Sequence, residues 1–164
     1  MAEILVAQDI AEFLGDATPS LGTVGTDIFR GPVRPFTKSG GTTLIPRNCI
    51  FVIENTGGDA PIPVAGSGYQ EIRTVSVQIV VRNTSSSSTK AQEVYNVLAD
   101  LTTADIVQPG YIVFEMAQSN PLFLPGLDNN VDAYWSINMD AIYDQTDVSF
   151  DAIYGTAVYG TGVY

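Results

Sequence analysis

Residues 71–101 read EIRTVSVQIVVR, then NTSSSS, then TKAQEVYNVLADL, and this stretch decides the fold. In its first part β-branched apolar residues alternate with polar ones, which predicts a β-strand with one buried face. In its last part apolar residues recur every three or four positions, which predicts an amphipathic helix. Thr89 and Gln92 have the spacing of a capping box at the start of that helix. A strand followed by such a helix predicts a sheet with one face covered by a helix.

Similar patterns predict the elements on either side. The order helix, strands, helix, strands is typical of an α+β domain with a mostly antiparallel sheet and two helices packed on one face. The continuous apolar run near Cys49 predicts a strand buried on both faces. We place the predicted elements at residues 2–14 (a helix that ends at Gly15), 27–30, 48–54, 71–82, 89–101, 111–118 and 133–143.

Alternation within the strands predicts which side chains form the core. The predicted core consists of Val75, Val77, Ile79, Ile112, Phe114, Trp135, Ile137 and Met139 from strands, with Val94, Tyr95 and Leu98 from the helix. Along the last strand, the opposite side is polar and is predicted to be outward-facing. It carries Tyr134, Ser136, Asn138 and Asp140.

Two long segments and a tail complete the chain. Residues 31–47 and 55–68 are rich in glycine and proline, and loops of this length are uncommon in a small domain unless they have a function. We therefore expect them to contact neighbouring molecules. Residues 1–145 form the single predicted domain. Residues 146–164 are predicted to be an extended tail with a Tyr-Gly-Thr repeat, either an arm that orders against a neighbour or a disordered extension.

The net charge of −11 is unevenly distributed. Every lysine and arginine lies at or before Lys90, while residues 91–164 contain ten acids and no base. Affinity for the DNA backbone requires cationic side chains, so residues 91–164 are not expected to bind DNA. The same asymmetry also serves simply to keep a protein in solution. No apolar run approaches the ~20 residues of a membrane span, and the acidic start is unlike a signal peptide.

The residues that usually carry catalysis are missing or isolated. The chain has no histidine, which excludes Ser-His-Asp triads, Cys-His pairs and histidine metal sites. Cys49 lies in an apolar run and is predicted to be a core residue and not a nucleophile. The run DNNVD at 128–132 resembles the start of a calcium loop but lacks its glycine and final acid, which predicts a solvated turn. We therefore expect no enzymatic activity, no cofactor and no metal.

Five segments follow one another in a fixed order along the chain: LGTVGTDIFRG from Leu21, ENTGG from Glu54, VSVQIVVR from Val75, IVFEM from Ile112 and WSINMD from Trp135. In this order they resemble the tail terminator proteins of long-tailed bacteriophages, a group that overlaps with families labelled phage minor capsid protein. The resemblance covers about residues 2–144, and the run at 128–132 takes the place of the family's polar turn without its glycine.

The resemblance implies a structural virion protein without catalysis or cofactor. It would form a ring, expected to be a hexamer, that ends the tail tube and joins it to the neck connector near the head. Its partners would be the major tail tube protein, the connector protein and DNA in transit, with no membrane. Its place would be the tail–neck junction of the virion, after assembly in the host cytoplasm.

Two alternatives stay open. One is a neighbouring head-completion protein of the stopper or adaptor kind. The other is a surface-attachment or carbohydrate-binding module, which the tyrosines and the long loops would suit.

Two groups of residues are the candidate sites. We expect the channel of a ring to be lined by Glu115, Asn138 and Asp140, because a neutral or acidic wall lets DNA pass without sticking. The same alternation suits an outer solvated face equally well. For contacts with partners, we expect cations and aromatic residues of the loops and the tail. The candidates are Arg30, Arg34, Phe36, Lys38, Arg47, Tyr154, Tyr159 and Tyr164.

Overall fold

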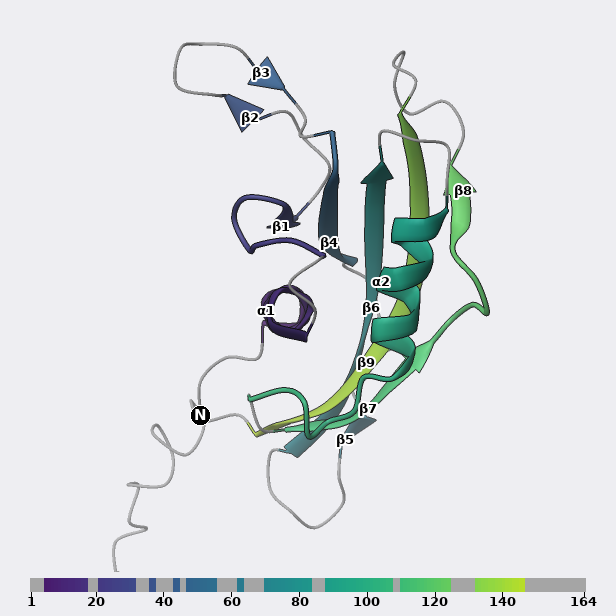
Figure 1. The fold of residues 1–164 in the computed structure, drawn as a ribbon. Coiled ribbons are helices and arrows are strands. Elements are labelled where there is room, and N and C mark those ends of the chain that lie inside the picture. The colour runs from purple at the N-terminus through teal and green to yellow at the C-terminus, as the bar shows by residue number, and fades with distance from the viewer. Residues whose placement is uncertain are drawn as a thin grey trace, which may run out of the picture.

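The computed structural model (Figure 1) has two helices and a mostly antiparallel sheet, which confirms the predicted α+β class. It describes residues 5–17, 21–31, 36–37, 43–44, 47–55, 62–63, 70–83, 88–107, 110–124 and 132–146. The helices are α1 (Val6–Ala17) and α2 (Thr89–Ala99). The strands are β1 (Ile28–Arg30), β2 (Phe36–Thr37), β3 (Thr43–Leu44), β4 (Cys49–Asn55), β5 (Ile62–Pro63), β6 (Gln70–Asn83), β7 (Tyr111–Met116), β8 (Leu122–Leu124) and β9 (Ala133–Thr146).

The sheet is built around β6 and β9, each 14 residues long. These two strands pair antiparallel along their whole length, from Gln70 opposite Thr146 to Asn83 opposite Ala133. The strand order is β1-β4-β6-β9-β7, with β5 beside the start of β6 and β8 beside the start of β9. Only β1 and β4 pair parallel among these strands. Strands β2 and β3 form a separate antiparallel pair.

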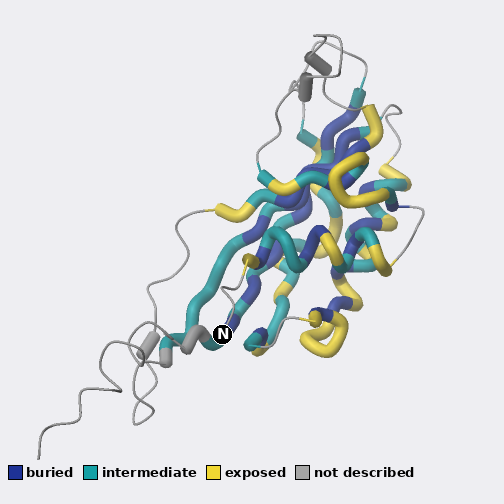
Figure 2. Tube along the Cα trace, turned by 90° about the vertical axis from the view of Figure 1, so that its left-hand side faces the viewer, coloured by how far each residue is buried: buried dark blue, intermediate teal, exposed yellow. Residues whose placement is uncertain are grey.

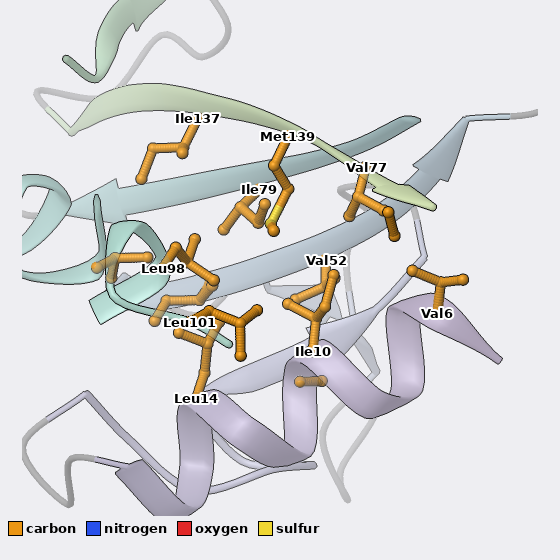
Figure 3. Close-up of a cluster of buried hydrophobic side chains, with 14 of the residues drawn as sticks. Val6, Ile10, Leu14, Val52, Val77, Ile79, Leu98, Leu101, Ile137 and Met139 are labelled. Carbon is orange, nitrogen blue, oxygen red and sulfur yellow. The ribbon is translucent and has the colours of Figure 1, made fainter. Parts of the chain in front are cut away.

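Both helices contribute to one core on one face of the sheet (Figure 3). Helix α1 packs near β1 and β4, and α2 lies over β6 and β9 (Figure 1). Ile10 and Leu14 of α1 and Leu98 of α2 point toward the strands. Most of the predicted core is confirmed: Val77, Ile79, Val94, Leu98, Ile137 and Met139 are buried, and Val75, Tyr95, Phe114 and Trp135 pack against them. Figure 2 shows buried segments gathered in the interior, with exposed segments around them.

The prediction for Ile112 is wrong. A β-bulge falls between Tyr111 and Val113, so the alternation is interrupted at this point. Tyr111 is buried in the core, and Ile112 is 50% exposed. Phe114 resumes the expected face, opposite Ala141.

The predicted helix ends also differ. Helix α1 continues through Gly15 to Ala17, and a Cβ at Gly15 would lie 2.9 Å from Cγ2 of Val24, so this glycine permits close packing instead of ending the helix. The capping box is wrong, because Ser88 precedes the first helical residue and makes no side-chain capping bond. Thr89 is already inside the helix, and the Gln92 amide donates to Asn96 Oδ1 at 3.0 Å instead.

The face opposite the helices is only partly polar. Near the end of β6 and the start of β9, this face has a second apolar cluster of Cys49, Phe51, Val80 and Tyr134. Ser136 is buried beside this cluster. The prediction that Tyr134 and Ser136 face outward into solvent is therefore wrong. The strand register explains why these two residues are buried. Across β6, Tyr134 and Ser136 are aligned with residues of β4, a strand that is buried on both faces. In the described part of the chain, no helix has the length and apolar character to cross a membrane.

Candidate interaction surfaces

The three candidate channel residues lie together on the face opposite the helices. Glu115 on β7 is the direct cross-strand partner of Asp140 on β9, and Asn138 lies two residues away on the same side. Ser76 and Gln78 of β6 are the cross-strand partners of Asp140 and Asn138 from the other side. We call these five residues, together with Gln118, the polar band. Three members are the candidate channel residues predicted from the sequence, and the pairing of β6, β9 and β7 sets which members lie beside one another.

Hydrogen bonds hold the polar band in one arrangement. The Ser76 hydroxyl donates to Oδ1 of Asp140 at 2.7 Å, and the Gln78 amide donates to the Ser136 hydroxyl at 2.9 Å. Gln118, from the connection after β7, accepts a bond of 2.8 Å from the Asn138 amide and donates one of 2.7 Å to the Ser136 carbonyl. Because the polar side chains of the band are already hydrogen-bonded, their positions are fixed before any partner binds.

The band carries negative charge and no base. Glu115 is exposed and Asp140 half-buried, and they are the only charged residues of the six. Such a surface does not bind phosphate groups, because it cannot release counterions from a nucleic acid. It offers neutral hydrogen-bonding groups flanked by two carboxylates, which suits weak and transient contact with a polyanion.

The predicted interface residues are more scattered. Arg30 is exposed at the end of β1, where its guanidinium donates a 2.6 Å hydrogen bond to the Gln8 side chain. Arg47 lies before β4, its side chain is 67% exposed, and it pairs with Asp132 of the same chain. Phe36 lies in β2, but its side chain is outside the described part. Arg34, Lys38, Tyr154, Tyr159 and Tyr164 lie outside the described residues.

Asp132 is the residue that sequence reasoning missed. Its side chain is fully buried and forms ion pairs with Arg82 at 2.8 Å and with Arg47 at 2.9 Å. Arg82 is 3% exposed, and its guanidinium also lies over the Tyr134 ring, 5.5 Å from the centroid. The prediction of a solvated turn is therefore wrong at Asp132.

No local pattern marks this ion pair. Asp132 immediately precedes β9, and Arg82 is the next-to-last residue of β6, where the register places the adjacent Asn83 opposite Ala133. The pairing of two strands fifty residues apart in the chain brings the charges together. It ties the residues before β4, the end of β6 and the start of β9 into one corner of the sheet.

Cys49 is chemically inert in this fold. It is fully buried beside Phe51 and Tyr134, and burial raises the pKa of its thiol to about 12. The thiolate that a nucleophile or a metal ligand requires is therefore not formed near neutral pH. The prediction of a core residue is confirmed.

A shallow acidic hollow lies between α1 and the connection from α2 to β7. Asp9, Glu12, Asp16 and Asp105 line it together with Phe13, Ile106 and Val107. Beside it, the Tyr111 hydroxyl donates to Oδ2 of Asp9 at 2.6 Å. Burial raises the Asp9 pKa, partly offset by this bond, and burial raises the Tyr111 pKa as well. Within the described residues, no group of three His, Cys, Asp or Glu side chains is arranged to hold a metal ion.

Comparison with known proteins gives no assignment. Models of known protein families do not match the chain, and a search of curated proteins finds no match either.

Proposed function

We propose that this protein is a structural virion protein that forms a ring at the end of a phage tail tube and joins the tube to the neck connector. The polar band is the observation that carries the proposal. A ring through which DNA passes needs a wall that does not retain phosphate groups, and the band presents amides, hydroxyls and two carboxylates with no cation.

The placement of the resembling segments supports the same function. They include β1 with the residues before it, the end of β4, and parts of β6, β7 and β9, which are strands of the main sheet. The resemblance thus involves the framework of the domain. It does not depend on a single surface loop.

The distribution of charge supports a protein with different surfaces for different partners. Arg30 and Arg47 are exposed near one end of the sheet, on β1 and before β4. The polar band lies on β6, β7, β9 and the connection after β7, and β1, which carries Arg30, is at the opposite edge of the sheet from β7. A ring of such subunits would turn its acidic surface toward DNA and its cations toward neighbouring proteins.

Electron microscopy of virions with a labelled chain tests the proposal. We expect one ring, of six copies, at the head-proximal end of each tail, and native mass spectrometry of the assembled ring should give the same number of copies. Label along the whole tube or at the distal tip would contradict it. A strictly monomeric chain within virions, or a monomer that binds glycans, would favour the attachment module instead.

The binding partner distinguishes a head-completion protein from a tail terminator. Purified chain is mixed with polymerised tail tubes or with isolated connectors, and each complex is recovered by sedimentation. A terminator binds the tube end and stops further growth of the tube. A chain that binds connectors and leaves tube growth unchanged belongs to the head-completion class.

A further inference from the structure

The β7–β8 edge of the sheet exposes apolar side chains. Six large apolar residues are exposed in the described part of the chain, and three of them, Ile112, Leu122 and Phe123, lie in these two strands. Both strands pair with β9 on one side, and no described strand pairs with their other side. An open edge of this kind presents backbone N–H and C=O groups to which another strand can add.

Strand β8 is the less protected part of this edge. Strand β7 carries the bulge at Ile112 and the charge of Glu115, two features that discourage pairing with a foreign strand. Residues 117–127 have no charge at all. Leu122 and Phe123 are each 53% exposed, and because they are consecutive they point to opposite faces of the sheet.

A buried donor lies next to the exposed ring of Phe123. Phe123 is the cross-strand partner of Trp135, and their ring centroids are 5.3 Å apart. The indole N–H of Trp135 is buried and has no acceptor among the described residues. A buried donor without an acceptor is unfavourable, and this one belongs to β9, one strand in from the open edge.

The chain itself contains a segment suited to this edge. Residues 152–164 read AIYGTAVYGTGVY, without charge or proline and rich in residues that favour strands. Because the repeat length is odd, an extended chain carries Ile153, Tyr159 and Val163 on one side and Tyr154, Val158 and Tyr164 on the other. A strand that is apolar on both sides matches an edge that exposes Leu122 on one face and Phe123 on the other.

The glycines of the repeat add to this fit. Gly155 and Gly160 each follow a tyrosine. A glycine in a strand leaves room for an aromatic ring of the adjacent strand to cover its backbone, which compensates for its missing side chain. Phe123, half exposed at the edge, is in the position to provide that ring.

We propose that residues 152–164 of one copy add as a β-strand to the β8 edge of a second copy of this chain. The inference rests on the proposed function, since it names the contact by which neighbouring subunits of the ring hold one another. The tail starts at Thr146, at the end of β9 far from β8, which pairs near Tyr134. Residues 147–151 span at most about 17 Å, short of the roughly 33 Å back to β8 of the same copy, so residues 152–155 could meet β8 only in a second copy, whereas residues from 156 onward also reach it within one chain.

Disulfide scanning of the full-length chain tests the proposal. Leu122→Cys is prepared in one batch, and Thr156→Cys, Ala157→Cys, Val158→Cys and Tyr159→Cys in four others. Each tail variant is mixed with the edge variant and oxidised, and interchain disulfides are counted by mass spectrometry. The native Cys49 is not expected to form disulfides in this experiment, because it is fully buried.

A strand contact gives a specific pattern. The yield of interchain disulfide is expected to alternate with a period of two along the tail, several-fold between neighbouring positions, because only one face of a strand meets Leu122. Repeating the series with Phe123→Cys should give the opposite phase. Val107→Cys, at a residue that is 100% exposed elsewhere, measures the background of random collision.

The inference would be overturned by disulfide yields that do not alternate, or by yields no higher than the Val107→Cys background. It would also be overturned if a variant that carries the edge cysteine and a tail cysteine in the same chain formed disulfides only within that chain. Native mass spectrometry of the parent chain on tail tubes reports ring formation separately. Rings without the alternating pattern would remove this contact and leave the proposed function. The alternating pattern without rings would support this contact and contradict the proposed function.

Discussion

The guanidinium of Arg82 and the carboxylate of Asp132 meet at 2.8 Å inside the protein, with side chains that are 3% and 0% exposed. Such a pair gains little over a well-packed apolar pair, yet it is costly to break, because the remaining charge stays buried without a partner. Asp132 also pairs with Arg47, whose side chain is mostly exposed. The two arginines therefore differ sharply in what their removal should do.

Replacement of Asp132 is expected to destabilise the fold strongly. Asp132→Asn keeps the shape but removes the negative charge, and we expect a loss of about 3–5 kcal/mol in the free energy of unfolding. Arg47→Ala removes the exposed partner of the same carboxylate and should cost no more than about 1 kcal/mol. Urea denaturation of both variants measures the difference. Equal costs for the two would contradict the assignment of Arg82–Asp132 as the dominant pair.

Asp9 is expected to make stability depend on pH. Its pKa is raised in the folded state from 3.8, mainly by burial, so the folded protein holds this proton more tightly than the unfolded chain. Stability should therefore fall as pH rises from 3.8 through the raised value and stay level above it. Asp9→Asn keeps an acceptor for Tyr111 and removes this dependence. Its advantage over the parent should grow across that window to no more than about 1 kcal/mol, given solvent screening.

The control for this pH effect is Asp16→Asn, an exposed acid at the end of the same helix, which changes the net charge equally. Unfolding free energies are measured from pH 3 to pH 7 for the parent and both variants. Parallel curves for the parent and Asp9→Asn would show that the carboxyl group does not titrate differently in the folded state.

Leu98 should be essential to the packing of α2. Its side chain is 1% exposed and lies in the main core. Leu98→Ala should cost about 2–5 kcal/mol, and Leu98→Asp more, since it buries a charge without a partner. Asn96→Asp, on the exposed side of the same helix, controls for the added charge. If Leu98→Asp melts at the temperature of the parent, the placement of α2 is wrong.

Positive charge on the polar band is expected to retard DNA. In the double variant Glu115→Lys with Asp140→Lys, the bond from Ser76 is lost at a cost of about 1 kcal/mol, so the fold should be retained. Two cations in place of two anions would bind phosphate groups, and ejection of DNA in vitro should be several-fold slower. Glu93→Lys, on the exposed side of α2, with Asp100→Lys, at the exposed residue that caps its C-terminus, makes the same charge change.

The salt dependence separates this effect from a general defect. Slower ejection that recovers at high salt only in the band variant supports an electrostatic role of the channel face. Equal ejection rates for the band and α2 variants would remove the channel assignment of Glu115, Asn138 and Asp140. The ring itself would be unaffected by that result.

The sequence by itself determined the elements whose signal is local. The alternation through Val77 and Ile79 gave β6, the helical stripe through Val94 and Leu98 gave α2, and the continuous apolar run at Cys49 gave a strand buried on both faces. These patterns are readable because strand and helix periods are properties of a few consecutive residues.

Only the tertiary structure decided what depends on strand neighbours. Asp132 looks like a solvated turn residue until the pairing of β6 with β9 places Arg82 beside it. Tyr134 and Ser136 look outward-facing until their rows are seen to include β4, and Ile112 looks inward until the bulge interrupts the alternation. Register and bulges are set by contacts between segments far apart in the chain, so no window of sequence contains the information that fixes them.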